Sequence, residues 1–146
     1  MEKVKFVLLG EEKVRKTSII AQYISETFNE CTILRGRDRE LKYLTIKDKK
    51  LELYIWDTSG HESYRVKNKI FIKNIQIALI VYDITDERSF HRLNDWINVI
   101  NEINKKEIIF GNSANKSDLF ESQIISREKG KKFADNNSCL FFWNKC

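Results

Sequence analysis

Residues 10–18 carry side chains that could bind a phosphate group. The segment reads Gly-Glu-Glu-Lys-Val-Arg-Lys-Thr-Ser and follows the apolar residues 4–9. In the pattern G-x-x-x-x-G-K-[ST], backbone N–H groups surround the α- and β-phosphates, the lysine reaches the β- and γ-phosphates, and the hydroxyl binds Mg²⁺. Gly10, Lys16 and Thr17 occupy their places in this pattern, but Arg15 stands where the second glycine belongs. The segment alone is weak evidence, because a Lys-Thr pair after a strand can simply open a helix.

Two further segments have the residue types and the order expected of a nucleotide site. Asp57 ends an apolar run, where a carboxylate would hold Mg²⁺, and the N–H of Gly60 could meet a γ-phosphate. Residues 115–118 read Asn-Lys-Ser-Asp after another apolar run, and the carboxylate of Asp118 can accept two N–H donors that guanine has and adenine lacks. Each segment could be a polar loop at a strand end, but their common order and spacing favour a nucleotide site.

The alternation of periodicities predicts the elements that would position these segments. Strands are predicted at residues 4–9, 41–46, 51–56, 75–82, 107–110 and 140–143, and helices at residues 17–24, 90–103 and 126–135. A turn at residues 47–50 joins two of the strands into a predicted hairpin. Strands that alternate with helices predict an α/β fold with a mostly parallel doubly wound sheet. Ligands of such sheets bind at the carboxyl ends of the strands, where all three segments fall.

Composition predicts one domain spanning residues 1–146. A chain of 146 residues with 42% hydrophobic content is long enough for one core. The formal net charge is +5, but the basic residues are interspersed with acids, which favours a solvated surface and no nucleic-acid partner. We expect a cytoplasmic protein, because no signal peptide is apparent and no apolar stretch approaches the roughly 18 residues of a membrane span. The three cysteines are odd in number and lack metal-ligand spacing, which suggests a reducing compartment.

Over residues 3–142 the chain resembles a Ras-superfamily small GTPase of the Rab type. The resemblance rests on residues 56–60, 79–86, 89–90 and 115–119. The Trp-Asp-Thr and Tyr-Asp-Ile-Thr blocks are more typical of Rab than of Ras or Arf proteins, and residues 8–11 and 28–30 are similar to endocytic Rabs. The resemblance implies the P-loop NTPase fold of small GTPases with one antiparallel hairpin at the sheet edge. It also implies that the chain binds GTP and GDP with Mg²⁺ and acts as a switch in vesicle-mediated transport.

The resemblance assigns a role to each matching residue. Lys16 would hold the β- and γ-phosphates, and Asn115 and Asp118 would read the guanine, with the stem of Lys116 along the base. Phe28 would pack on the other side of the base, although an ordinary core contact explains it equally well. The expected nucleotide contacts are Gly10, Glu12, Lys13, Val14, Arg15, Lys16, Thr17, Ser18, Phe28, Gly60, Asn115, Lys116 and Asp118, and the expected metal ligands are Thr17, Asp57 and Thr32.

Four departures from the family pattern qualify this assignment. Arg15 and Lys13 stand where relatives carry glycine, so we expect a strained loop and weaker binding. His61, which with Lys16 forms the expected catalytic pair, replaces the glutamine that orients the attacking water, so we expect slow hydrolysis. Ungapped alignment places Leu34 where relatives carry the threonine of the first switch, and only a shifted register supplies Thr32.

The C-terminal region also departs from the family. The final helix and the prenylated tail are missing, and Cys146 alone is no prenylation motif, so we expect no membrane anchor in this chain. The sequence is either a truncated product or a reduced relative with an exposed apolar sheet face.

Two alternatives to a hydrolysing switch stay open. The first is a pseudo-GTPase that serves as a binding module or decoy. The second is a P-loop kinase or ATPase, which residues 115–118 disfavour. The resemblance implies a monomer that binds effector, exchange-factor and activating proteins, located at endosomal membranes only if a lipidated full-length form exists.

Overall fold

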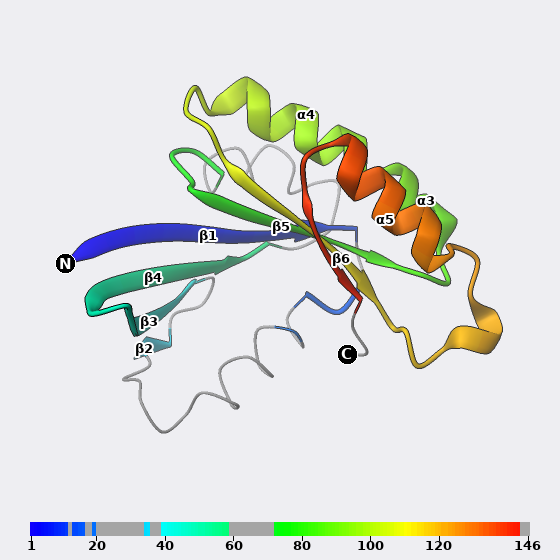
Figure 1. Ribbon diagram of the computed structural model, residues 1–146, viewed down its shortest axis with the longest axis horizontal. Coiled ribbons are helices and arrows are strands. Elements are labelled where there is room, and N and C mark those ends of the chain that lie inside the picture. The colour runs from blue at the N-terminus through cyan, green and yellow to red at the C-terminus, as the bar shows by residue number, and fades with distance from the viewer. Residues whose placement is uncertain (12, 17–18, 20–33, 36–38, 59–71, 144–146) are drawn as a thin grey trace.

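The chain folds around a seven-stranded sheet. The computed structural model describes residues 1–11, 13–16, 19, 34–35, 39–58 and 72–143. The strand order is β2-β3-β4-β1-β5-β6-β7 (Figure 1). Strand β1 pairs in parallel with β4 and β5, and β6 in parallel with β5 and β7, whereas β3 is antiparallel to β2 and β4. The predicted fold, a mostly parallel sheet with an antiparallel hairpin at its edge, is confirmed.

Most predicted strands are present with bounds that differ at their ends, and the helix predicted at residues 17–24 lies outside the described residues apart from residue 19. The strands are β1 Glu2–Gly10, β2 Leu34–Arg35, β3 Arg39–Ile46, β4 Lys49–Asp57, β5 Ile77–Asp83, β6 Ile109–Asn115 and β7 Leu140–Trp143. The helices are α3 Glu87–His91, α4 Leu93–Ile103 and α5 Arg127–Asn136, with a short 3-10 turn at Phe120–Ser122. The strand β2 was not predicted, because two residues are too few to show a period.

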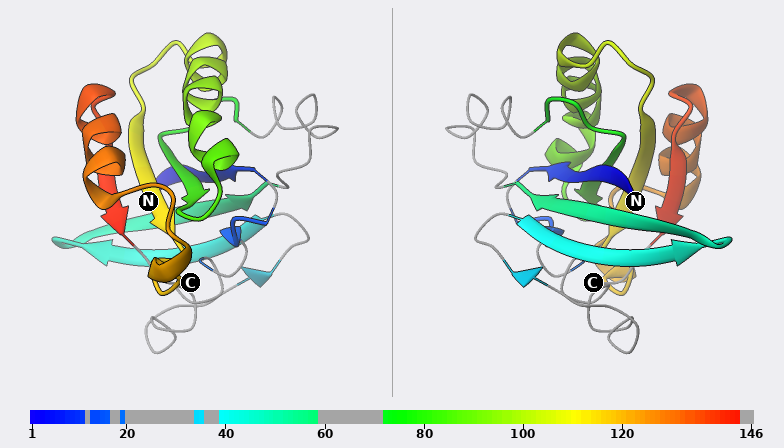
Figure 2. Two further views of the ribbon diagram at one scale, coloured as in Figure 1. Left: turned by 90° about the vertical axis from the view of Figure 1, so that its right-hand side faces the viewer. Right: turned by 90° about the vertical axis from the view of Figure 1, so that its left-hand side faces the viewer.

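Helices α3, α4 and α5 lie together on one side of the sheet, as both views of Figure 2 show. Alternate strand residues point to this side and pack with the helices into the larger core, which includes Val7, Leu9, Ile80 and Tyr82. A smaller cluster on the opposite side is formed by Leu8, Val14, Ile55 and Val81. The division follows from the strand period of two, since neighbouring residues of one strand point to opposite faces.

The single helix predicted at residues 90–103 is in fact two helices. Asp86 begins α3, and its side chain accepts a hydrogen bond from the backbone N–H of Arg88. Arg92, with φ −77° and ψ −9°, separates α3 from α4. The apolar spacing of Phe90, Leu93 and Trp96 continues across this break, which is why periodicity alone did not reveal it.

The prediction for β6 was wrong in its extent. The predicted strand covered residues 107–110, but β6 runs from Ile109 to Asn115 and so includes the first residue of the expected guanine-reading segment. Its register with β5 continues as far as the pair Asp83 and Asn115. Asn112 and Ser113 are buried in this strand although they are polar. They interrupt the apolar pattern, so the pattern did not indicate that the strand continues.

The hairpin turn is tighter than predicted. It consists of Lys47 and Asp48, which both have positive φ angles, 48° and 66°. Two central residues with positive φ are typical of the primed turns that match the twist of antiparallel strands. The helix predicted at residues 126–135 is confirmed as α5, where the hydroxyl of Ser126 accepts a hydrogen bond from the N–H of Lys129 at 3.1 Å.

Exposed apolar side chains are present on the last two strands. Ile109, Leu140 and Phe142 are 57%, 58% and 44% exposed. Leu140 is paired with Gly111, and a Cβ built on Gly111 would meet the side chains of Leu79 and Phe142. These side chains therefore share the sheet face opposite the three helices.

Asn112 should destabilise the fold, and its replacement by leucine should make the protein more stable. The residue is 2% exposed, its amide nitrogen and oxygen have no hydrogen-bond partner, and its strand neighbours Ile80 and Phe141 are core residues. An unsatisfied buried amide costs about 1–3 kcal/mol. We expect Asn112→Leu to raise the free energy of unfolding by about that amount, measured by urea denaturation. Asn112→Ala, which removes the amide but leaves a cavity, should gain less, and a less stable leucine variant would contradict the assignment.

Candidate nucleotide-binding site

The candidate site lies at the carboxyl ends of four neighbouring strands. Parallel pairing brings Leu8 beside Asp57, Gly10 beside Val81, and Asp83 beside Asn115. The phosphate-loop segment, the Asp57 segment and the guanine segment thus begin at one edge of the sheet, as their sequence positions predicted.

Gly10 begins the loop at a position where no side chain fits. Its φ angle is 150°, and a Cβ there would lie 2.3 Å from the carbonyl oxygen of Val81. That contact is with backbone, which cannot move aside as a flexible side chain can. The glycine is therefore required by the close approach of β1 and β5 at the start of the loop.

Two residues of the loop adopt the left-handed conformation that glycine favours. Lys13 has φ 67° and Arg15 has φ 66°, and both side chains are exposed. A residue with a Cβ pays about 1–2 kcal/mol for this conformation. Both positions therefore hold a torsion that glycine would adopt without this cost.

Lys16 is buried against the start of the loop. It is 6% exposed, and its ammonium donates hydrogen bonds to the carbonyl oxygens of Gly10 at 3.0 Å and Glu11 at 2.9 Å. The side chain of Glu11 in turn lies 3.7 Å from the guanidinium of Arg92, between α3 and α4. A positive charge is thus fixed inside the curve of the loop, where the charge of a phosphate would be stabilised.

The guanine segment is tied to the phosphate loop by a buried hydrogen bond. The side-chain amide of Asn115 donates to the carbonyl oxygen of Val14 at 2.8 Å. Lys116 has φ 63°, and its carbonyl accepts a hydrogen bond from the N–H of Leu119 at 2.9 Å, which closes a turn. Asp118 lies in this turn with its side chain exposed. A carboxylate in that place is accessible to a ligand at the strand ends.

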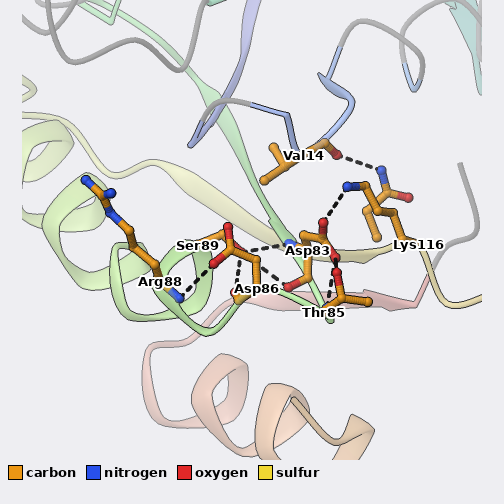
Figure 3. Close-up of polar contacts among 8 residues, drawn as sticks. Val14, Asp83, Thr85, Asp86, Arg88, Ser89 and Lys116 are labelled. Atoms are coloured by element: carbon orange, nitrogen blue, oxygen red, sulfur yellow. Dashed lines mark hydrogen bonds and ion pairs between the residues drawn. The ribbon is translucent and has the colours of Figure 1, made fainter. Parts of the chain in front are cut away.

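Asp83, at the end of β5, holds the guanine segment from the other side. One carboxylate oxygen accepts hydrogen bonds from the N–H and hydroxyl of Thr85 at 2.8 and 2.7 Å, and the other accepts from the ammonium of Lys116 (Figure 3). Burial raises the pKa of Asp83, but the hydrogen bonds from Lys116 and Thr85 and the charge of Lys116 outweigh it. The net effect lowers the pKa of this carboxyl below its ordinary value of 3.8.

Of the expected metal ligands, only Asp57 belongs to the described residues. It ends β4, and the hydroxyl of its neighbour Thr58 donates to the carbonyl of Leu8 at 2.6 Å, which holds this segment to β1. Within the described ranges, no group of three or more His, Cys, Asp or Glu side chains could hold a metal ion. A Mg²⁺ site completed by phosphate and hydroxyl oxygens fits this arrangement, since Asp57 offers the oxygen ligand that the ion prefers. When bound, the ion would neutralise phosphate charge.

Several residues predicted for the site lie outside the described residues. They are Glu12, Thr17, Ser18, Phe28, Thr32, Gly60 and His61. Leu34 is described only as a member of β2, where it pairs with Leu41.

Sequence reasoning gave no role at the site to Asp83, Thr58 or Arg92. Asp83 and Thr58 stand inside the blocks that carried the resemblance, so their position after buried strands was an available signal. Arg92 had no such signal, because its contact with Glu11 depends on the break between α3 and α4.

Comparison with known proteins agrees with this geometry. The model of the Ras family matches residues 5–144, and the chain belongs to this family. Its relatives are Rab proteins, so it is a Rab-type member of the small GTPases.

Three relatives illustrate the similarity. The chain is 35% identical to mouse Ras-related protein Rab-17, 36% to Ras-related protein RabF1 of Dictyostelium discoideum and 31% to Ras-related protein Rab-10 of Caenorhabditis elegans. The matches cover 94%, 90% and 94% of this chain but 64%, 69% and 69% of the three relatives. The chain therefore spans about two thirds of the length of these proteins. In the described part of the chain, no helix is long and apolar enough to cross a membrane.

The stability that Asp83 contributes should disappear in acid. Its pKa in the folded protein is below that of the unfolded chain, so the contribution is complete above the unfolded value and is lost as pH falls through the folded value. The difference in unfolding free energy between the natural chain and Asp83→Asn should therefore be constant near neutral pH and shrink below about pH 4. Urea denaturation across this range measures it. A difference that grows with acidity would contradict the assigned direction.

Proposed function

We propose that the chain binds GTP and GDP together with Mg²⁺ and acts as a molecular switch in vesicle-mediated transport. The observation that carries the proposal is the hydrogen bond from Asn115 to Val14, which joins the segment expected to read guanine to the loop expected to hold phosphates. A ligand that engages both would need a base and a phosphate chain, which a nucleotide has. Family membership supports the choice of guanine, and Asp118 is exposed in the turn where the base would be read.

The switch role follows from family membership alone. Its partners would be the effector, exchange-factor and activating proteins that the family implies, and its location would be the cytoplasm or the surface of endomembranes. Hydrolysis would be slow, because His61 replaces the water-orienting glutamine. In this role Lys16 and His61 would form the catalytic pair, with Thr17, Asp57 and Thr32 around the metal ion.

A second candidate function is favoured by the backbone of the phosphate loop. Lys13 and Arg15 hold left-handed torsions at some energetic cost, which fits a pseudo-GTPase that has kept the fold as a binding module and lost tight nucleotide binding. Calorimetry with GTP, GDP and ATP, followed by single-turnover hydrolysis, distinguishes the two. A switch should bind both guanine nucleotides and prefer them to ATP. Absence of binding to all three would support the pseudo-GTPase.

Base choice should depend on Asp118. A carboxylate that accepts both N–H donors of guanine contributes about 1.5–3 kcal/mol. We expect Asp118→Asn to lose affinity for GDP and gain affinity for xanthosine diphosphate, because an amide can donate to the xanthine oxygen. Asp118→Ala is the control, which should lose guanine without gaining xanthine. Equal affinity of the natural chain for GTP and ATP would overturn the guanine assignment.

Arg15 should weaken nucleotide binding through its backbone. Arg15→Gly should tighten GDP and GTP binding roughly tenfold if about 1.4 kcal/mol of strain is relieved. Arg15→Ala is the matched control, because alanine removes the guanidinium but keeps the Cβ that makes the torsion unfavourable. Calorimetric affinities of the three proteins test this prediction. Weaker binding in both variants would mean that the guanidinium is itself a phosphate ligand.

A further inference from the structure

Asp83 is held in position by several contacts that do not involve Lys116. Its backbone N–H donates to the hydroxyl of Ser89 at 2.9 Å, and this hydroxyl donates to the carbonyl of Asp86 at 2.7 Å. The N–H of Asp86 donates back to the carbonyl of Asp83 at 3.0 Å. Thr85 donates two hydrogen bonds to one carboxylate oxygen, so both the backbone and the side chain of Asp83 are held, and Figure 3 shows these contacts meeting at the start of α3.

Lys116 is held at both ends. Its backbone is in the left-handed conformation, with φ 63°, and its ammonium lies against the free oxygen of the Asp83 carboxylate. Both side chains are largely buried, 15% and 7% exposed. Its neighbour Asn115 is bonded to Val14 of the phosphate loop. Lys116 thus anchors the guanine segment to β5, and Asn115 anchors it to the phosphate loop.

We propose that Asp83 is a positioning residue for the base-reading turn: by fixing Lys116 it sets residues 115–119 in their binding conformation before any nucleotide arrives. This inference rests on the proposed function as far as the nucleotide is concerned. A turn that is already ordered loses less conformational freedom on binding, so the contacts of Asp118 with a base contribute more fully to affinity. The same carboxylate compensates the buried charge of Lys116, which would otherwise stand unpaired beside the base.

A merely structural ion pair would behave differently. Its loss would lower the stability of the whole protein and would leave the choice among bases unchanged. A positioning role instead predicts that the discrimination between guanine and a base with fewer donors depends on Asp83. Inosine diphosphate is the suitable probe, because hypoxanthine lacks the exocyclic amino group of guanine and is otherwise the same base.

The test compares Asp83→Asn with a control from the same network. Asp86→Ala removes the hydrogen bond that caps α3 but does not touch Lys116, so it should lower the melting temperature and leave nucleotide affinities unchanged. Asp83→Asn should weaken GDP binding on the order of tenfold and reduce the preference for GDP over inosine diphosphate. An unchanged preference would overturn the inference.

A double-mutant cycle shows whether Asp83 acts through Lys116. If it does, Asp83→Asn should have little further effect on GDP affinity in a Lys116→Met background, since the side chain that it positions is gone. Fully additive losses would overturn the inference.

A nucleotide-free measurement separates this inference from the proposed function. Lysine acetylation of the natural chain and Asp83→Asn, read by mass spectrometry, reports how well Lys116 is held, with Lys131 on the exposed face of α5 as internal reference. Asp83→Asn should raise the labelling of Lys116 relative to Lys131. If the natural chain binds no guanine nucleotide, the proposed function fails, and unchanged labelling would in addition overturn the positioning role of Asp83.

Discussion

The structure of the site depends on one buried hydrogen bond between segments that are far apart in the sequence. The side-chain amide of Asn115 donates a hydrogen bond to the carbonyl of Val14 at 2.8 Å and so joins these two loops directly. Because Asn115 is the last residue of β6, its position is determined by pairing with β5 and not by the flexibility of a loop. The sheet therefore determines the distance between residues 115–118 and the loop that contains Val14.

The segment that begins at Gly10 contains two different demands on the backbone, one for space and one for a left-handed torsion. Gly10 remains, because a Cβ would collide with the backbone of β5, whereas Lys13 and Arg15 occupy left-handed positions that glycine would adopt without strain. A position that requires only a left-handed torsion can carry a side chain at an energetic cost. A position where a Cβ would collide with backbone cannot carry one.

Most of the fold could be predicted from the sequence, because apolar periodicity and strand-end motifs determine which elements form and where they meet. The prediction failed where buried polar residues interrupt that pattern, as Asn112 and Ser113 do in β6, and where a break leaves periodicity intact, as Arg92 does between α3 and α4. At the site, the motifs predicted the edge of the sheet and the loops. The position of Asp83 after a buried strand was an available signal, but its contact with Lys116 was not. The contact of Arg92 with Glu11 forms only after folding, so no local pattern indicated it.

The strand order has a consequence for how the protein is made. Strand β1, which leads into residues 10–18, is synthesised before both of its neighbours in the sheet, β4 and β5. Gly10 obtains its partner Val81 only after the whole segment between them has been synthesised. Until then the apolar face of β1 has no sheet to join, and closing such long loops is slow. The nascent chain is therefore exposed to aggregation for as long as its nucleotide loop lacks support, a period in which chaperones would act on it.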